Sequence, residues 1–112
     1  MARPLPTAEV HWRGSRRDQR ALALRHDWSD LSGLEQLWGR LADQHGEAIA
    51  LDAPHAKPPE QLSFRTLHQR IEQAAAGFAA LGVRSGEVVA LFSENSPRWL
   101  LADQGLMRLG AA

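Results

Sequence analysis

Two short segments carry side chains of the types that take part in chemistry. Asp52 and His55 precede a proline-rich stretch, and a carboxylate close to an imidazole is a common beginning of a metal site. The sequence places no third ligand beside them, so we interpret this segment as a solvent-facing loop. The second segment is the turn Ser93–Ser96, which leads from an apolar run into a helical pattern. Many α/β proteins bind anions at such a position.

The turn has a simpler interpretation as the start of a helix. Ser96 is a preferred N-cap residue, and Pro97 suits the first position of the helix. The carboxylate of Glu94 would also repel an anion. We therefore predict that Ser96 caps the helix, and direct ligand binding by the turn is the alternative.

The remaining sequence lacks the common motifs of phosphate binding and nucleophilic catalysis. There is no glycine-rich loop ending in Gly-Lys-Ser or Gly-Lys-Thr, no Gly-x-Gly-x-x-Gly after a strand, and no Gly-x-Ser-x-Gly. The chain has no cysteine, which excludes disulfides, thiolate metal sites and cysteine nucleophiles. Thirteen basic residues balance thirteen acidic ones, so nucleic-acid binding is not expected.

The basic side chains gather near the N-terminus, at Arg13, Arg16, Arg17 and Arg20. We interpret residues 1–31 as a poorly ordered, solvated arm. A peripheral contact with an anionic membrane surface is the second interpretation of this cluster. No apolar run reaches the roughly 18 residues of a membrane span, and the N-terminus lacks a signal-peptide pattern. We expect a cytoplasmic protein, with membrane association as the alternative.

The first helix is predicted over residues 33–45. Ser32 and Glu35 have the spacing of a capping box, in which each side chain bonds the other residue's backbone N–H. Gly46 stands where a left-handed residue would end the helix. The apolar stripe of this helix comprises Leu34, Leu37, Trp38 and Leu41.

A hairpin and a long helix are predicted next. A short strand over residues 47–52 and a brief strand over 62–64 flank a loop that contains three prolines. The helix runs from about Arg65 to Gly82, and the small residues over 74–77 would let another element approach closely. Its apolar face comprises Leu67, Ile71, Ala74, Ala75, Phe78 and Leu81.

The C-terminal part predicts a buried strand and a crossover helix. Val88–Phe92 is continuously apolar, which is typical of a parallel strand covered on both faces. The helix that begins at Pro97 ends at Gly110, and Trp99 and Leu106 lie on its apolar stripe. A crossover helix leads into a second parallel strand, and none follows. The sequence therefore predicts an α/β fold with an incomplete parallel sheet and flanking helices, in a truncated domain over 32–112.

Residues 34–112 together resemble the adenylate-forming enzymes. Leu62-Ser-Phe-Arg-Thr-Leu67 is similar to their L-T-Y-x-E-L sequence, although Thr66 replaces the usual acidic residue and weakens the expected cap from Ser63. The segments Ala75–Val83, Gly86–Ala90, Asn95–Trp99 and Leu109–Ala111 are similar to further family motifs. Asp52–Pro59 and Ala90–Gly105 resemble the long-chain fatty-acid ligases of cyanobacteria and plastids, which use acyl carrier protein or CoA.

This resemblance implies a function for a longer parent protein. Such enzymes activate a fatty acid with ATP and Mg²⁺ to an acyl-adenylate, then transfer the acyl group to CoA or acyl carrier protein. Their phosphate loop, nucleotide pocket and lid lysine lie beyond Ala112, so no catalytic, cofactor-binding or metal-binding residue is assigned here. We expect the 112 residues alone to be inactive. The alternatives are an aryl- or amino-acid-adenylating ligase and a small α/β interaction module.

Overall fold

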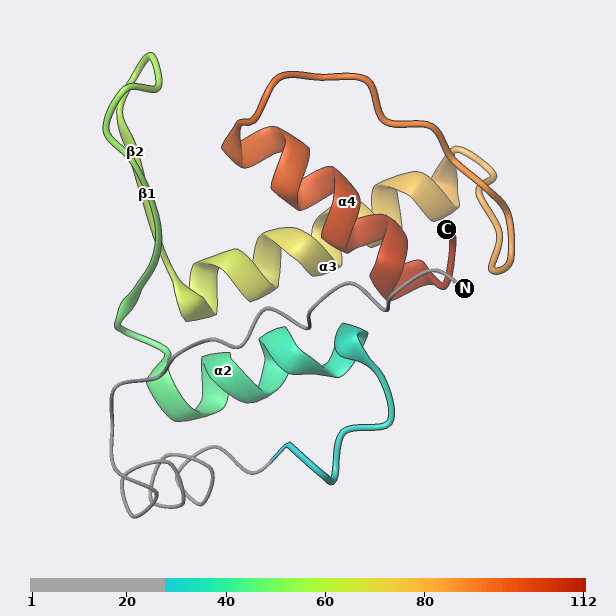
Figure 1. Ribbon diagram of the computed structural model, residues 1–112, viewed down its shortest axis with the longest axis horizontal. Helices are drawn as coiled ribbons and strands as arrows, with labels where there is room; N and C mark the ends of the chain where they lie inside the picture. The colour runs from blue at the N-terminus through green and yellow to red at the C-terminus, as the bar shows by residue number, and fades with distance from the viewer. Residues whose placement is uncertain (1–27) are drawn as a thin grey trace, which may run out of the picture. The chain divides into compact units, whose positions relative to one another are not determined.

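Helix α3 (Phe64–Ala80) contacts the other two helices and both strands in the part of the chain that the structure describes. The computed structural model describes residues 28–112, of which Leu31–Ala112 form one unit. In chain order its elements are the 3-10 turn η1 (Leu34–Gln36), α2 (Leu37–His45), β1 (Ile49–Ala53), β2 (Glu60–Ser63), α3 and α4 (Pro97–Leu109), as Figure 1 shows. Trp12 and the arginines at 13–20 lie outside the described residues.

The core is centred on the face of α3 that the sequence predicts. Leu67 and Ile71 are fully buried, and Leu62 of β2 packs beside them. Complete burial of one such side chain contributes about 1.5–3 kcal/mol to folding. Neighbouring elements close the cluster with partly buried residues: Trp38, Ala50, Leu51, Leu100 and Leu101.

The predicted hairpin is confirmed as the only sheet among the described residues. Strands β1 and β2 pair antiparallel, with Leu51 opposite Leu62 and Ala53 opposite Glu60. Strand β2 ends at Ser63 because this residue caps α3: its Oγ accepts the Thr66 N–H at 3.1 Å. The two hydroxyl groups also bond each other at 3.1 Å, so Thr66 does not weaken the helix start as expected.

The predicted boundaries of the first helix are nearly right, but both of its end contacts differ. Ser32 bonds Gln36 instead of Glu35, through its N–H at 3.1 Å and its Oγ at 2.7 Å, because Gly33 is the N-cap and a 3-10 turn precedes α2. Gly46 has a right-handed conformation, with φ −45°. A Cβ there would lie 2.7 Å from the backbone oxygen of Ala42 and 2.5 Å from the guanidinium of Arg65, so a close approach, not a left-handed turn, accounts for this glycine.

The strand predicted over Val88–Phe92 is absent from the structure. Val88 is 85 % exposed and Phe92 is fully exposed, since no neighbouring strand runs along this segment within the described residues. Helix α4 ends as predicted at Gly110, whose φ of 86° is left-handed. The α/β class is confirmed, as helices accompany a small sheet, but that sheet is antiparallel.

Helices α3 and α4 cross at the small residues that the sequence indicates. A Cβ on Gly105 would lie 2.8 Å from the Ala74 Cβ and 3.1 Å from the Ala75 backbone nitrogen. Gly77, which the sequence included in the same small stretch, has nothing within 4 Å of such a Cβ. The contact therefore depends on Ala74, Ala75 and Gly105, and Gly77 takes no part.

These two glycines make a matched pair for a stability measurement. Gly105→Ala should lower the free energy of unfolding by about 1–3 kcal/mol, because the added methyl group meets backbone that cannot move aside. Gly77→Ala should raise it by about 0.5–1 kcal/mol, because alanine restricts the unfolded chain and meets open space. Urea denaturation of both variants checks this. Equal effects of the two substitutions would contradict the crossing described here.

Candidate functional site

The N-terminus of α4 is built as the sequence predicts. Ser96 is extended, and its Oγ accepts the backbone N–H of Trp99 at 3.2 Å. Pro97 occupies the first helical position, where no N–H is needed. The Ser96 hydroxyl oxygen is thus engaged as a helix cap, which confirms the capping interpretation of the Ser93–Ser96 turn.

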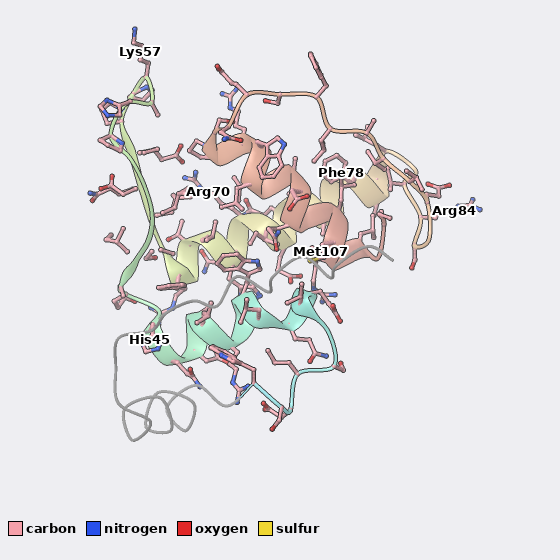
Figure 2. All side chains as sticks on the ribbon, in the orientation of Figure 1. His45, Lys57, Arg70, Phe78, Arg84 and Met107 are labelled. Atoms are coloured by element: carbon pink, nitrogen blue, oxygen red, sulfur yellow. The ribbon has the colours of Figure 1, made fainter. Side chains whose placement is uncertain are left out.

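The loop between β1 and β2 extends away from the helices. Figure 2 shows Lys57 at its tip, with the side chain pointing outward. The ends of the hairpin are tied to α3 by two ion pairs. Arg70 donates to Glu60 at 2.5 Å, and Arg65 donates to Glu47. Both pairs are partly exposed, so each orients the hairpin more than it stabilises the fold.

A cleft of about 940 Å³ lies between this loop and the N-terminus of α4. It brings together the two segments that the sequence singled out, Asp52 with His55 and Ser93–Ser96, of which all but Ser93 line it. The other lining residues are Leu51, Ala53, Pro54, Ala56, Lys57, Pro97 and Trp99. A second opening of about 690 Å³ shares Lys57 and Glu94 with it and also reaches Ser93.

Charged and titratable side chains line the cleft, among them Asp52, His55 and Lys57. No group of three His, Asp or Glu side chains within residues 28–112 is arranged to hold a metal ion. Asp52 and His55 are thus not part of such a group among these residues. The hydroxyl of Ser96 has no histidine among its hydrogen-bond partners. The sequence analysis assigned no role to Lys57, although it is the only lysine in the chain.

Two tryptophans lie on helices as the apolar stripes predict. Trp38 packs against the core, and its Nε1 donates to Gln104 Oε1 at 2.7 Å, which joins α2 to α4. The polar partner Gln104 was not anticipated from the sequence. Trp99 is half-buried and also lines a hollow of about 230 Å³ beside Val89 and Leu91. Both rings serve packing in this structure.

Much of the apolar surface remains uncovered within residues 28–112. Besides Val88 and Phe92, the side chain of Leu81 is 82 % exposed at the end of α3. An apolar hollow of about 360 Å³ lies beside it, between α3 and α4. Figure 2 labels Phe78, which lines this hollow, on α3. An exposed apolar surface of this kind is typical of a contact with further polypeptide.

Residues 39–112 match the AMP-binding enzyme family. The chain belongs to this family. The match includes α2, the hairpin, α3 and α4, so every helix and strand described here except η1 and the first two residues of α2 falls within it.

Individual relatives differ in the acids that their names specify. The chain is 40 % identical over 83 residues to the chloroplastic long-chain-fatty-acid–acyl-carrier-protein ligase of Arabidopsis thaliana, covering 74 % of this chain and 11 % of that protein. It is 45 % identical over 69 residues to the 2-succinylbenzoate–CoA ligase of Salmonella typhimurium, covering 61 % and 15 %. The chain thus spans less than a sixth of the length of these two relatives.

Solved structures of ligases share the fold. Escherichia coli MenE with bound OSB-AMS superposes with a TM-score of 0.61 and 36 % identity, over 72 % of this chain and 17 % of that one. The chain thus spans about a sixth of the length of that solved structure. Among residues 28–112, no helix combines the length and the apolar character that crossing a bilayer requires.

The capping role of Ser96 yields a direct test. Ser96→Ala should lower the free energy of unfolding by about 1 kcal/mol, within a range of 0.5–2, because the Trp99 N–H loses its acceptor. Ser93→Ala is the matched control, since the Ser93 hydroxyl bonds only the neighbouring carbonyl of Glu94, in an exposed position. Urea denaturation measures both, and an equal loss in the two variants would argue against the cap.

Proposed function

We propose that residues 32–112 are the first part of the large domain of a long-chain acyl-activating ligase, preceded by an arm over residues 1–31. The parent enzyme would activate a fatty acid with ATP and transfer the acyl group to CoA or acyl carrier protein. Family membership supports the adenylate-forming chemistry. The fatty-acid substrate, the thiol acceptor and a cytoplasmic location go beyond the family and are proposed.

The choice of a fatty acid as the substrate rests on one observation, the similarity of this chain to two Arabidopsis proteins. The chloroplastic ligase is 40 % identical over three quarters of this chain, and a probable acyl-activating enzyme of the same plant is 35 % identical over the same length. Asp52–Pro59, which comprises the end of β1 and the mostly exposed loop after it, also resembles the same subfamily in sequence. Packing does not constrain an exposed loop, so its similarity favours common descent within that group.

The described residues contribute scaffold to this reaction. They hold no cluster of metal-binding side chains, so a Mg²⁺ ion would be bound by other parts of the parent. Within residues 28–112 no glycine-rich phosphate loop is present, and the Ser96 hydroxyl is used as a cap. We therefore propose that ATP binding and catalysis depend on residues of the parent other than those described here.

A ligase for a different acid is the second candidate. The 2-succinylbenzoate–CoA ligase has the higher percentage identity, 45 %, although over fewer residues. The crystal structure of an anthranilate CoA ligase, which shares the fold with a TM-score of 0.65 and 28 % identity over 74 % of this chain, adds a second aromatic acid to this alternative.

The substrate is tested by assaying the complete protein encoded by the parent gene. Purified protein is mixed with ATP, Mg²⁺ and one of three acids: palmitate, 2-succinylbenzoate or anthranilate. We expect acid-dependent exchange of pyrophosphate into ATP to be at least tenfold faster with palmitate than with either aromatic acid. Faster exchange with an aromatic acid would favour the second candidate, and no exchange with any of the three would reject both.

The 112-residue chain provides a separate prediction. It should catalyse no pyrophosphate exchange with palmitate, because the described residues lack a phosphate-binding loop and a metal site. The control is the reaction without protein, measured in the same assay. Exchange above that background would show that the chain itself contains catalytic residues.

In the complete enzyme, Ser96→Ala distinguishes scaffold from ligand contact. We expect a lower melting temperature and nearly unchanged Michaelis constants for ATP and fatty acid, because a cap holds the helix and not the substrate. A several-fold increase in either constant at unchanged melting temperature would mean that the turn binds a substrate. Ser93→Ala again serves as the control.

A further inference from the structure

Asn95 is the only asparagine in the chain, and it lies in the turn that precedes α4. The residue is exposed and lines the cleft beside the hairpin loop. Within residues 28–112 no hydrogen bond restrains its side-chain amide. The amide of Gln104 is a contrast, since it accepts from Trp38 at 2.7 Å and donates to Asp103 at 2.8 Å. The Asn95 amide is therefore free to rotate.

The backbone nitrogen that follows Asn95 is also unengaged. Ser96 is the N-cap of α4, with an extended φ of −159°, so its N–H lies outside the hydrogen bonds of the helix. Its carbonyl oxygen accepts the N–H of Leu100 and its Oγ accepts that of Trp99, both at 3.2 Å. The Ser96 N–H has no acceptor among the described residues. The helix thus engages both oxygens of Ser96 and leaves its nitrogen open.

These two groups are the reactants of asparagine deamidation. Asparagine is one of the thermolabile residues of proteins, because the nitrogen of the next residue can attack its side-chain carbonyl carbon and close a five-membered ring. A backbone N–H that is bonded within a helix or sheet is held away from that carbon, and a bulky next residue hinders the approach. Ser96 is small and its N–H is unbonded within the described part of the chain, so neither restraint applies at this turn.

We propose that Asn95 is a site of spontaneous deamidation, with Ser96 as the attacking residue. The Ser96 nitrogen forms a bond to Cγ of Asn95 and gives up its proton to water. The bond from Cγ to Nδ2 breaks, and the amide nitrogen takes up a proton and leaves as ammonia. Water then opens the succinimide at either of its two carbonyl carbons. The products are aspartate and isoaspartate at position 95, and the only reactants are this chain and water.

The reaction places a new carboxylate at the cleft. Asp52 and Glu94 already line it, so deamidation raises the number of lining carboxylates from two to three. A negative charge close to the first turn of a helix is favourable, so we expect α4 to stay folded. The modified cleft should repel anionic ligands more strongly than the unmodified one. The inference does not depend on the proposed function.

The experiment incubates the 112-residue chain at mildly alkaline pH and follows residue 95 by peptide mapping and mass spectrometry. A free peptide of residues 91–100 is the reference. We expect a mass increase of one dalton at residue 95, and both aspartate and isoaspartate as products. The rate should lie within about threefold of that of the free peptide, because an exposed turn offers little protection. Asn95→Gln is the matched control, which keeps an amide but would have to close a larger ring, and it should not change.

Three results would overturn the proposal. A rate at least tenfold below that of the free peptide would mean that the folded turn restrains Asn95 or Ser96. Aspartate without isoaspartate would exclude the ring, because direct hydrolysis of the amide gives aspartate alone. An equal mass increase in Asn95→Gln would assign the lost ammonia to a glutamine.

Circular dichroism during the incubation checks that the helices persist. If the isolated chain loses its helical signal, the same mapping is carried out on the complete parent protein. There too, a rate at least tenfold below that of the free peptide would overturn the proposal, and a rate within about threefold would support it. None of these readouts depends on ligase activity, so the substrate assay can fail without affecting this test.

Discussion

Burial of one face of α3 is the interaction on which the rest of the described structure depends. Leu67 and Ile71 are excluded from solvent only because β2, α2 and α4 all pack against the same helix. The small residues of that helix, Ala74 and Ala75, allow α4 to approach at Gly105. Without this face, the hairpin would be an isolated pair of strands with no other element packed against it. Such a pair is rarely stable on its own.

Polar contacts between side chains also join the helices that surround the core. Trp38 and Gln104 link α2 to α4 through a hydrogen bond of 2.7 Å at a partly buried position. Arg108 and Glu72 link α4 to α3 at 2.7 Å, nearer the surface. Exposed pairs of this kind contribute little to stability, typically below about 1 kcal/mol. They join α4 to its two neighbouring helices, α2 and α3.

The described surface combines a cleft lined by charged side chains with uncovered apolar side chains elsewhere. The loop 54–59 and the start of α4 meet at a cleft, yet no group of metal-binding side chains forms there among residues 28–112. Apolar side chains are exposed elsewhere. Leu81 lies at the C-terminal end of α3, and Val88 and Phe92 lie on the segment that connects α3 to α4. The family relatives, of which this chain spans less than a sixth, have further polypeptide with which such surfaces can be covered.

The sequence by itself determined the helices, the hairpin and the helix caps at Ser96 and Gly110, because each depends on residues within a few positions of one another. It also predicted the α3 core face and the small residues at the helix crossing. Only the tertiary structure decided the partner of Ser32, the right-handed Gly46 beneath Arg65, and the absent strand over 88–92. The approach of Arg65 to Gly46 and the missing strand depend on groups that are close in space but not in sequence, whereas the Ser32–Gln36 bonds are local and accompany the 3-10 turn at Leu34–Gln36. A strand in particular exists only where a second backbone bonds it, and here Ala112 provides that partner at a single position.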